Sequence, residues 1–358
     1  MTSRAMIMAG GTGGHVFPAL AVAAALQKQN TEIAWIGTGK GIEVKLVPTA
    51  GYPLYFIHVQ GLRGNGLLGW LLAPFKLVKA VYEAIRIISK VKPDVVIGLG
   101  GFASGPGGVA AWLLRKPLVI HEQNAIPGLT NRLLSKIAKR ILEGFDNSFV
   151  NCNKAEWVGN PVRASIETLS APKQRFDGRS LPIRLLVLGG SLGAKTLNEL
   201  MPKAIAHLNR ERYEIRHQCG ERHLADCKLN YQQAGVDADI TAFIDDMSTA
   251  YAWADLVICR AGALTIAELS AAGVGSILVP YPYAVDDHQT HNAQALVDVG
   301  AAYLIQEKTV TTELLAEKIQ QCSDDRAQLL AMANAARTQA KLGTAEHISS
   351  ICLELAHG

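Results

Sequence analysis

Two stretches, one in each half of this 358-residue chain, share the pattern of an apolar run followed by Gly-Gly-Thr/Ser-x-Gly. The first is MIMAGGTGGH, Met6–His15, and the second is LLVLGGSLGA, Leu185–Ala194. A strand that runs into a glycine-rich turn and then a helix is typical of doubly wound α/β domains, because glycine lets a phosphate approach the N–H groups of the helix start. The repeated pattern therefore predicts two α/β domains, each with a place for a phosphate.

Neither turn matches a common nucleotide-binding fingerprint completely. A dinucleotide-binding turn needs G-x-G-x-x-G, but Gly11-x-Gly13 is followed by Val16 where the third glycine should stand. A P-loop needs a glycine before its Lys-Thr pair, and Ala194 occupies that position. Glycine also serves plain strand-to-helix packing, so each turn by itself leaves that alternative open. A third cluster, GLGGFASGP at 98–106, also follows an apolar run and should lie at the same sheet edge as the first.

Short apolar runs alternate with amphipathic stretches along the chain, which predicts parallel sheets with crossover helices. The expected strands are Ala5–Ala9, Ile33–Ile36, Val95–Leu99, Leu118–His121, Arg184–Leu188, Glu214–His217, Asp239–Phe243, Leu256–Cys259, Ser276–Val279 and Ala302–Ile305. A polar stretch at 165–182 with two prolines and a glycine predicts a linker. We therefore expect domains at 1–163 and 164–340, with a last helix at 341–358 that packs back toward the first domain.

Composition excludes several classes of protein. With 49% apolar and 18% charged residues the chain is expected to fold rather than remain disordered. Its six cysteines form no C-x-x-C pair, and its start has too short an apolar run for a signal peptide, so a reducing cytoplasm is expected. The longest apolar stretch, 67–88, contains a proline and four charged residues, which argues against a membrane span.

Charge is distributed unevenly between the two expected domains. Residues 1–163 hold 18 Lys and Arg against 8 Asp and Glu, whereas residues 164–358 hold 17 against 23. A basic half is compatible with nucleic acid, an anionic membrane surface or phosphorylated substrates, and charge alone leaves these three open. The segment 61–79 mixes Trp70 and Phe75 with Lys76 and Lys79, as a membrane-surface segment does, although a core helix with solvated lysines has the same pattern.

Several polar residues stand where chemistry could occur. His15 ends the first glycine turn, where a neutral imidazole could accept a proton, and His121-Glu122-Gln123-Asn124 follow an expected strand. Glu268 could accept hydrogen bonds from ribose hydroxyls, its alternative being a solvated helix face. The stretch 286–291 offers an H-x-x-H spacing, but metal sites need more convergent ligands, so we expect sugar contacts there and no metal.

Seven motifs, in order along nearly the whole chain, resemble those of the MurG family. They are GGTGGHVFPALA (10–21), GGFASGP (from Gly100 and Gly101 to Pro106), HEQNAIPGLTN (121–131), GNPVR (159–163), GGSLGA (189–194), FIDDM (243–247) and RAGALTIAEL (260–269). One departure is Phe102, where some members carry tyrosine, so no phenolic hydroxyl is available at that position.

The resemblance implies a GT-B fold, which is an α/β fold of two doubly wound Rossmann-like domains with an interdomain cleft. It implies an inverting transfer of GlcNAc from UDP-GlcNAc to undecaprenyl-pyrophosphoryl-MurNAc-pentapeptide (lipid I), which gives lipid II for peptidoglycan. The first domain would take the lipid acceptor and the second the donor, without a cofactor. The protein would work as a peripheral protein at the cytoplasmic face of the cell membrane, on anionic lipid, without nucleic acid and with contacts to cell-wall or division proteins.

The family's binding residues carry over to positions of this chain that match its motifs. Ser191, Ala263 and Leu264 would hold the donor diphosphate, followed on the same helix by Thr265, Ile266 and Ala267. Ile244 would present backbone atoms to uracil and Glu268 would bind ribose. The remaining donor contacts would come from Thr12, Gly13, Gly14, Asn124, Arg163 and Gln289, with His288 near the sugar. For the base we expect His15, with Glu122 as the alternative or as a group that polarises it.

Overall fold

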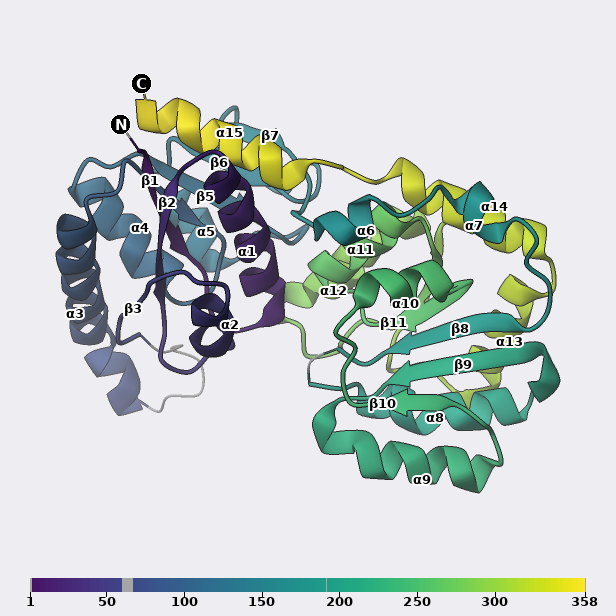
Figure 1. The fold of residues 1–358 in the computed structure, drawn as a ribbon. Helices are drawn as coiled ribbons and strands as arrows, with labels where there is room; N and C mark the ends of the chain where they lie inside the picture. The colour runs from purple at the N-terminus through teal and green to yellow at the C-terminus, as the bar shows by residue number, and fades with distance from the viewer. Residues whose placement is uncertain (1, 60–66, 191, 358) are drawn as a thin grey trace. The chain divides into compact units, whose positions relative to one another are not determined.

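The computed structural model describes residues 2–59, 67–190 and 192–357. The chain forms two compact units (Figure 1). Unit 1 comprises Met1–Arg163 together with Gly343–Gly358, and unit 2 comprises Ala164–Leu342. Each unit is a parallel sheet with helices on both faces, as the alternating pattern predicts.

Unit 1 contains a seven-stranded sheet in the order β3-β2-β1-β4-β5-β6-β7, with every neighbouring pair parallel. The strands are β1 Arg4–Met8, β2 Glu32–Gly37, β3 Leu54–Phe56, β4 Val95–Gly98, β5 Leu118–Glu122, β6 Arg140–Glu143 and β7 Ala155–Trp157. The order reverses direction between β1 and β4, and this switch point is where ligands bind in doubly wound sheets. Both glycine clusters of this unit follow β1 and β4.

The helices of unit 1 cover the two faces of this sheet separately. They are α1 Gly13–Lys28, α2 Glu43–Thr49, α3 Leu67–Val91, α4 Ser104–Leu113, α5 Leu129–Leu134 and α15 Thr344–His357. Side chains alternate along β1, so that Ala5 and Ile7 pack with α1 and α15 while Met6 and Met8 pack with α3 and α4. The last helix is held by hydrogen bonds as well, because Gln29 Nε2 donates to Ser349 Oγ at 2.8 Å.

Unit 2 repeats the architecture with six parallel strands in the order β10-β9-β8-β11-β12-β13. The strands are β8 Ile183–Leu188, β9 Tyr213–Gln218, β10 Asp239–Thr241, β11 Leu256–Cys259, β12 Gly275–Leu278 and β13 Ala302–Leu304. The α-helices are α6 Ala164–Glu167, α7 Pro172–Phe176, α8 Lys195–Ala206, α9 Leu224–Ala234, α10 Met247–Trp253, α11 Ala263–Ala272, α12 His288–Val297, α13 Thr312–Ser323 and α14 Arg326–Thr338. Three single 3-10 turns are η1 Arg210–Arg212, η2 Glu221–His223 and η3 Val285–Asp287.

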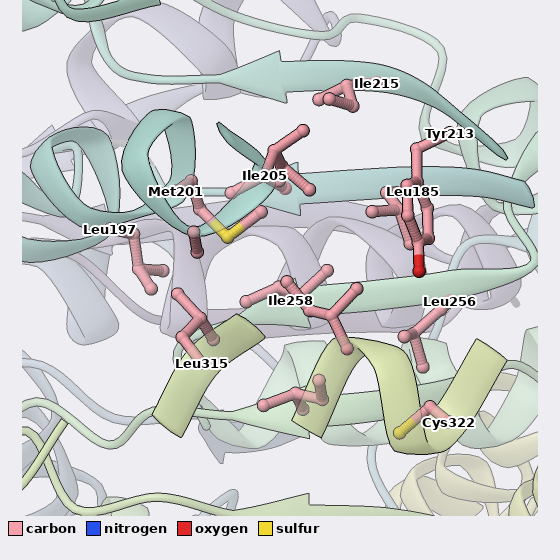
Figure 2. Close-up of a cluster of buried hydrophobic side chains, with 14 of the residues drawn as sticks. Leu185, Leu197, Met201, Ile205, Tyr213, Ile215, Leu256, Ile258, Leu315 and Cys322 are labelled. Atoms are coloured by element: carbon pink, nitrogen blue, oxygen red, sulfur yellow. The ribbon is translucent and has the colours of Figure 1, made fainter. Parts of the chain in front are cut away.

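The core of unit 2 lies between the sheet and helices α8 and α13 (Figure 2). Leu197, Met201 and Ile205 recur every four residues, so they share one face of α8 and point at the sheet. Leu315 and Cys322 of α13 complete the layer. This packing fixes the helix whose start follows the second glycine turn.

The polar stretch 165–182 is part of unit 2 and is more ordered than a linker. It forms α6 and α7, and its arginines dock on the unit: Arg175 Nη2 donates to Gly273 O, and Arg179 Nη1 pairs with the buried Asp255 Oδ1 at 2.6 Å. Local composition favoured a linker because Pro and Gly break regular structure, whereas these two contacts depend on residues 98 and 76 positions away in the sequence.

Among the described residues, no helix combines the length and the apolar character that are needed to cross a membrane. The segment 61–79, expected to be either a surface segment or a core helix, lies partly outside the described residues. From Leu67 onward it belongs to α3, where Ala73, Ala80 and Ala84 are buried.

Candidate functional site

In unit 1 the two glycine turns press against each other at the carboxyl end of the sheet. Gly101 has a φ of 81°, and a Cβ there would lie 2.4 Å from Gly10 O. Gly100 has a φ of 95°, and a Cβ there would lie 2.3 Å from His15 Nδ1. Both positions therefore require glycine for its backbone conformation and for the close approach. The neighbouring order of β1 and β4 brings the turns together.

The first turn ends at the positive end of α1. Thr12 is the N-cap residue in an extended conformation, and the helix has neither a side-chain cap nor an acidic residue in its first turn. Thr12 and Gly14 are exposed, and Gly13 and His15 are half-buried. N–H groups at an uncapped helix start attract anions, so this end of α1 suits a phosphate.

The side chain of Glu43, a residue that the sequence did not single out, fixes this turn through hydrogen bonds. Its side chain is fully buried; Oε2 accepts from Gly11 N at 2.9 Å, and Oε1 accepts from Thr38 N at 3.0 Å and Thr38 Oγ1 at 2.8 Å. A buried carboxylate is retained when it is hydrogen-bonded in this way. Its sequence position, in the first turn of a short helix, gives no signal that separates it from a solvated helix-start carboxylate.

His15 is the outer end of a chain of hydrogen bonds that runs into the core. His15 Nδ1 lies 3.1 Å from Gln123 Oε1, and Gln123 Nε2 lies 2.8 Å from Leu99 O and 3.2 Å from His121 Nδ1. His121 Nε2 in turn lies 2.9 Å from Gly159 O. Burial lowers the pKa of His121 to about 4, although the hydrogen bond to Gly159 and the charge of Glu122 act in the opposite direction. His121 is therefore neutral near pH 7.

Glu122 points away from this chain and organises the loop that follows. Oε1 accepts from Asn124 N at 3.0 Å and from its Nδ2 at 3.2 Å. Oε2 accepts from Gly128 N at 3.1 Å and from Asn131 Nδ2 at 2.9 Å. The four polar residues that the sequence grouped as one cluster thus divide: His121 and Gln123 serve the His15 side, whereas Glu122 and half-buried Asn124 belong to the loop.

Arg163 ends unit 1. Its guanidinium carbon lies 5.4 Å from the centre of the Phe17 ring on α1, a cation–π arrangement. The contact places the last residue of the GNPVR motif beside the helix that carries His15.

In unit 2 the second glycine turn is clamped by Gln218, another residue that sequence reasoning missed. Gln218 Oε1 accepts from Gly190 N at 3.0 Å, and its Nε2 donates to Gly190 O at 3.1 Å and to Ala242 O at 2.9 Å. Gly193 has a φ of 78°, and a Cβ there would lie 2.4 Å from Cys219 O. The predicted contact residue Ser191 lies outside the described residues.

Helix α11 begins at a second uncapped positive end. Gly262 is its N-cap residue, and Ile266 N is the first helix amide bonded to Gly262 O, at 2.9 Å. The N–H groups of Ala263, Leu264 and Thr265 precede that bond and point out of the helix start, where an anion is stabilised. Ala267 is half-buried on the same helix.

Glu268 is buried, with 5% of its surface exposed, so the alternative of a solvated helix face is wrong. Its Oε2 accepts a hydrogen bond from the Tyr251 hydroxyl of α10 at 3.1 Å. The sequence missed Tyr251, because nothing local marks a tyrosine 17 residues earlier as a partner.

The other predicted contacts of unit 2 lie on the loop after β10 and at the start of α12. Ile244 is half-buried beside exposed Phe243. Gln289 Oε1 accepts from Tyr281 N at 2.9 Å, which ties the start of α12 to the loop after β12, and half-buried His288 precedes it. Within the described ranges, no group of three or more His, Cys, Asp or Glu side chains is arranged to hold a metal ion.

Comparison with known proteins places these features in a family context. Residues 5–143 match the model of the glycosyltransferase family 28 N-terminal domain, and residues 184–348 match that of the C-terminal domain. The chain is 53% identical, over 100% of both chains, to the UDP-N-acetylglucosamine–N-acetylmuramyl-(pentapeptide) pyrophosphoryl-undecaprenol N-acetylglucosamine transferase of Nitrosococcus oceani. It is 51% identical to the transferase of the same name from Marinobacter nauticus, over 99% of this chain and 98% of the relative. Among solved structures, the crystal structure of Acinetobacter baumannii MurG is similar with a TM-score of 0.85 and 41% identity, over 98% of this chain and 99% of that one.

Proposed function

This chain belongs to the MurG family within glycosyltransferase family 28, and we propose that it transfers GlcNAc from UDP-GlcNAc to undecaprenyl-pyrophosphoryl-MurNAc-pentapeptide to form lipid II. The observation that carries the proposal is 53% identity to such a transferase over the whole length of both chains. The two units supply matching chemistry, because each has an uncapped helix start for a phosphate.

Unit 2 is the donor unit in this proposal. The amides of Ala263 and Leu264 at the positive end of α11, with Ser191 in the second glycine turn, hold the diphosphate. Glu268 accepts hydrogen bonds from the ribose hydroxyls, Ile244 presents its backbone to uracil, and Thr265 to Ala267 continue the contact along α11. Gln289 and His288 lie at the start of α12 and contact the sugar.

Unit 1 takes the acceptor and provides the base. An acceptor hydroxyl oxygen bonds to the anomeric carbon, the bond from that carbon to the diphosphate oxygen breaks, and UDP leaves with the electron pair. Negative charge grows on the diphosphate, and preorganised amides and the guanidinium of Arg163 stabilise it. The hydroxyl proton passes to an imidazole nitrogen of His15. The backbone of Thr12, Gly13 and Gly14 and the side chain of Asn124 complete the donor contacts.

His15 is a better base than Glu122 on the geometry of this unit. Both carboxylate oxygens of Glu122 already accept hydrogen bonds from its own loop, and the side chain is 3% exposed. His15 is half-buried and ends the exposed glycine turn. We assign Glu122 the role of shaping the loop that carries Asn124.

The acceptor is lipid-linked, and we propose that unit 1 meets the cytoplasmic face of the membrane through what we call the α3–α5 surface. It consists of exposed apolar side chains and exposed cations on α3, α4 and α5, which cover one face of the sheet, and on the turn that follows α4. The apolar members are Phe75, Val78, Tyr82, Trp112, Leu113, Leu129 and Leu133, and the cations are Lys76, Lys79, Arg115 and Arg132. This combination is typical of a segment that lies on anionic lipid, and the excess of 10 positive charges over residues 1–163 adds to the attraction.

The proposal is tested by supplying UDP-GlcNAc labelled in the sugar together with lipid-linked MurNAc-pentapeptide. We expect the label to move into the organic phase with the lipid. A labelled product that stays in water would replace the proposal by another UDP-sugar reaction, such as epimerisation. Binding of UDP-GlcNAc without any transfer would make the chain a sugar-nucleotide-binding module.

A further inference from the structure

The hydrogen bonds around Gln123 determine which nitrogen of His15 carries a proton. Gly159 O can only accept, so His121 Nε2, 2.9 Å away, must carry hydrogen, and neutral His121 then has its lone pair on Nδ1. The group of Gln123 that lies 3.2 Å from this lone pair and 2.8 Å from Leu99 O must therefore be the NH₂ donor. The amide oxygen is left facing His15.

An amide oxygen also only accepts, so His15 Nδ1, 3.1 Å from Gln123 Oε1, must be the protonated nitrogen. A flipped Gln123 would place its oxygen against Leu99 O and the lone pair of His121, two repulsive contacts in a site where Gln123 is 2% exposed. We propose that Gln123 and His121 are positioning residues that fix His15 as the Nδ1–H tautomer, with its lone pair on Nε2.

The tautomer of His15 follows from the hydrogen bonds alone, whereas its effect on turnover rests on the proposed function. Nε2 is then the atom that accepts the acceptor's hydroxyl proton, and the resulting imidazolium keeps its Nδ1–H bond to Gln123. The same hydrogen bonds serve both protonation states, so the step requires no rearrangement of the site. Gly100 leaves room for the imidazole ring of His15 in this position, because a Cβ at residue 100 would lie 2.3 Å from Nδ1 of the ring.

The direct test uses the unmodified protein. In ¹⁵N NMR of protein labelled at histidine, a protonated ring nitrogen and one with a lone pair resonate far apart, and the spectrum of His15→Gln identifies the signals of His15. At about pH 8.5, above the ordinary histidine pKa of about 6.5, we expect His15 to carry hydrogen on Nδ1. A dominant Nε2–H form would overturn the inference.

The variant test is Gln123→Met, which keeps the size of the side chain and removes its polar atoms. We expect a mixture of His15 tautomers and a fall in kcat of ~10- to 100-fold, less than the ~10²- to 10⁴-fold attributed to a whole general base. KM for UDP-GlcNAc should change little. Adding His121→Phe to this variant should lower kcat little further, because His121 acts through Gln123.

The matched control is Asn160→Ala, which removes the hydrogen bond from Asn160 Nδ2 to the main-chain oxygen of Gln123, 3.0 Å long, without touching the side-chain relay. It should lower stability and leave the His15 tautomer unchanged. An unchanged tautomer and kcat in Gln123→Met would contradict the positioning role. A wild-type protein with the Nδ1–H form but no transfer would count against the proposed function and leave the tautomer assignment standing.

Discussion

His15 is the single side chain on which proton transfer should depend most directly. We expect His15→Ala to lower kcat by ~100-fold or more, the lower range for loss of a general base. UDP affinity should be largely retained, because the donor contacts proposed beside His15 come from the backbone of Thr12 to Gly14, which the substitution leaves in place. Single-turnover transfer and calorimetric UDP binding on the same preparation measure both quantities. Near-normal turnover would remove His15 from the mechanism.

Glu268 and Tyr251 allow a second test with single residues. Glu268→Gln keeps an oxygen for the Tyr251 hydroxyl but removes the charge, so a charge-assisted bond to ribose worth ~1.5–3 kcal/mol should lose about half of its strength and UDP should bind roughly 3- to 10-fold less tightly. A ribose contact acts in both ground and transition states, so kcat should change little.

The control for this contact is Tyr251→Phe, which leaves the carboxylate and deletes only the hydroxyl that donates to it at 3.1 Å. It should weaken UDP binding much less than Glu268→Gln. Equal losses in the two variants would mean that Glu268 acts by holding Tyr251, and unchanged affinity in both would refute the ribose contact.

At the scale of structural elements, the contact between the two glycine turns of unit 1 predicts a large loss of stability on substitution. Gly101→Ala combines a φ of 81° with a Cβ 2.4 Å from Gly10 O, so we expect at least ~2 kcal/mol of destabilisation and displaced turns. Gly39→Ala is the matched control, since a Cβ there meets nothing within 4 Å. Urea unfolding should separate the two variants clearly. Equal stabilities would show that the turns do not press against each other.

The α3–α5 surface is also tested as an element. Phe75 and Val78 are 75% and 68% exposed, and Phe75→Ser with Val78→Ser removes apolar area that full burial would make worth ~1.5–3 kcal/mol per side chain. Binding to vesicles containing anionic lipid should fall at least ~10-fold. Tyr283→Ser, which alters an 81%-exposed ring in unit 2, should not affect vesicle binding. If vesicle binding changes neither with these substitutions nor with the anionic lipid content, the α3–α5 surface does not contact the membrane.

For the whole molecule, one buried neutral histidine in each unit couples stability to pH. Burial lowers the pKa of His121 to about 4 and that of His217 to about 3. Between the ordinary value of about 6.5 and these values the unfolded chain binds more protons than the folded one, so stability is fully present above about pH 6.5 and falls by up to ~1.4 kcal/mol per pH unit for each histidine as pH decreases.

Urea unfolding at about pH 7.5 and about pH 5 measures this loss. His217 contacts the Tyr231 hydroxyl at 2.9 Å and Asn198 Oδ1 at 3.0 Å, and His217→Gln should reduce the pH dependence while lowering stability at neutral pH. A pH dependence identical to that of the unmodified protein would show that His217 does not titrate with unfolding.

The sequence by itself determined the architecture of both units, because strand periodicity and glycine turns are local features: a tight turn that needs positive φ favours glycine whatever the rest of the chain does. It also singled out His15, Glu122 and Glu268. It did not identify Glu43, Gln218 or Tyr251, nor the separate roles of Gln123 and Glu122. Those roles depend on which strands are neighbours. His15 and Gln123 are 108 residues apart and meet only because β1, β4 and β5 lie side by side, which tertiary packing alone decides.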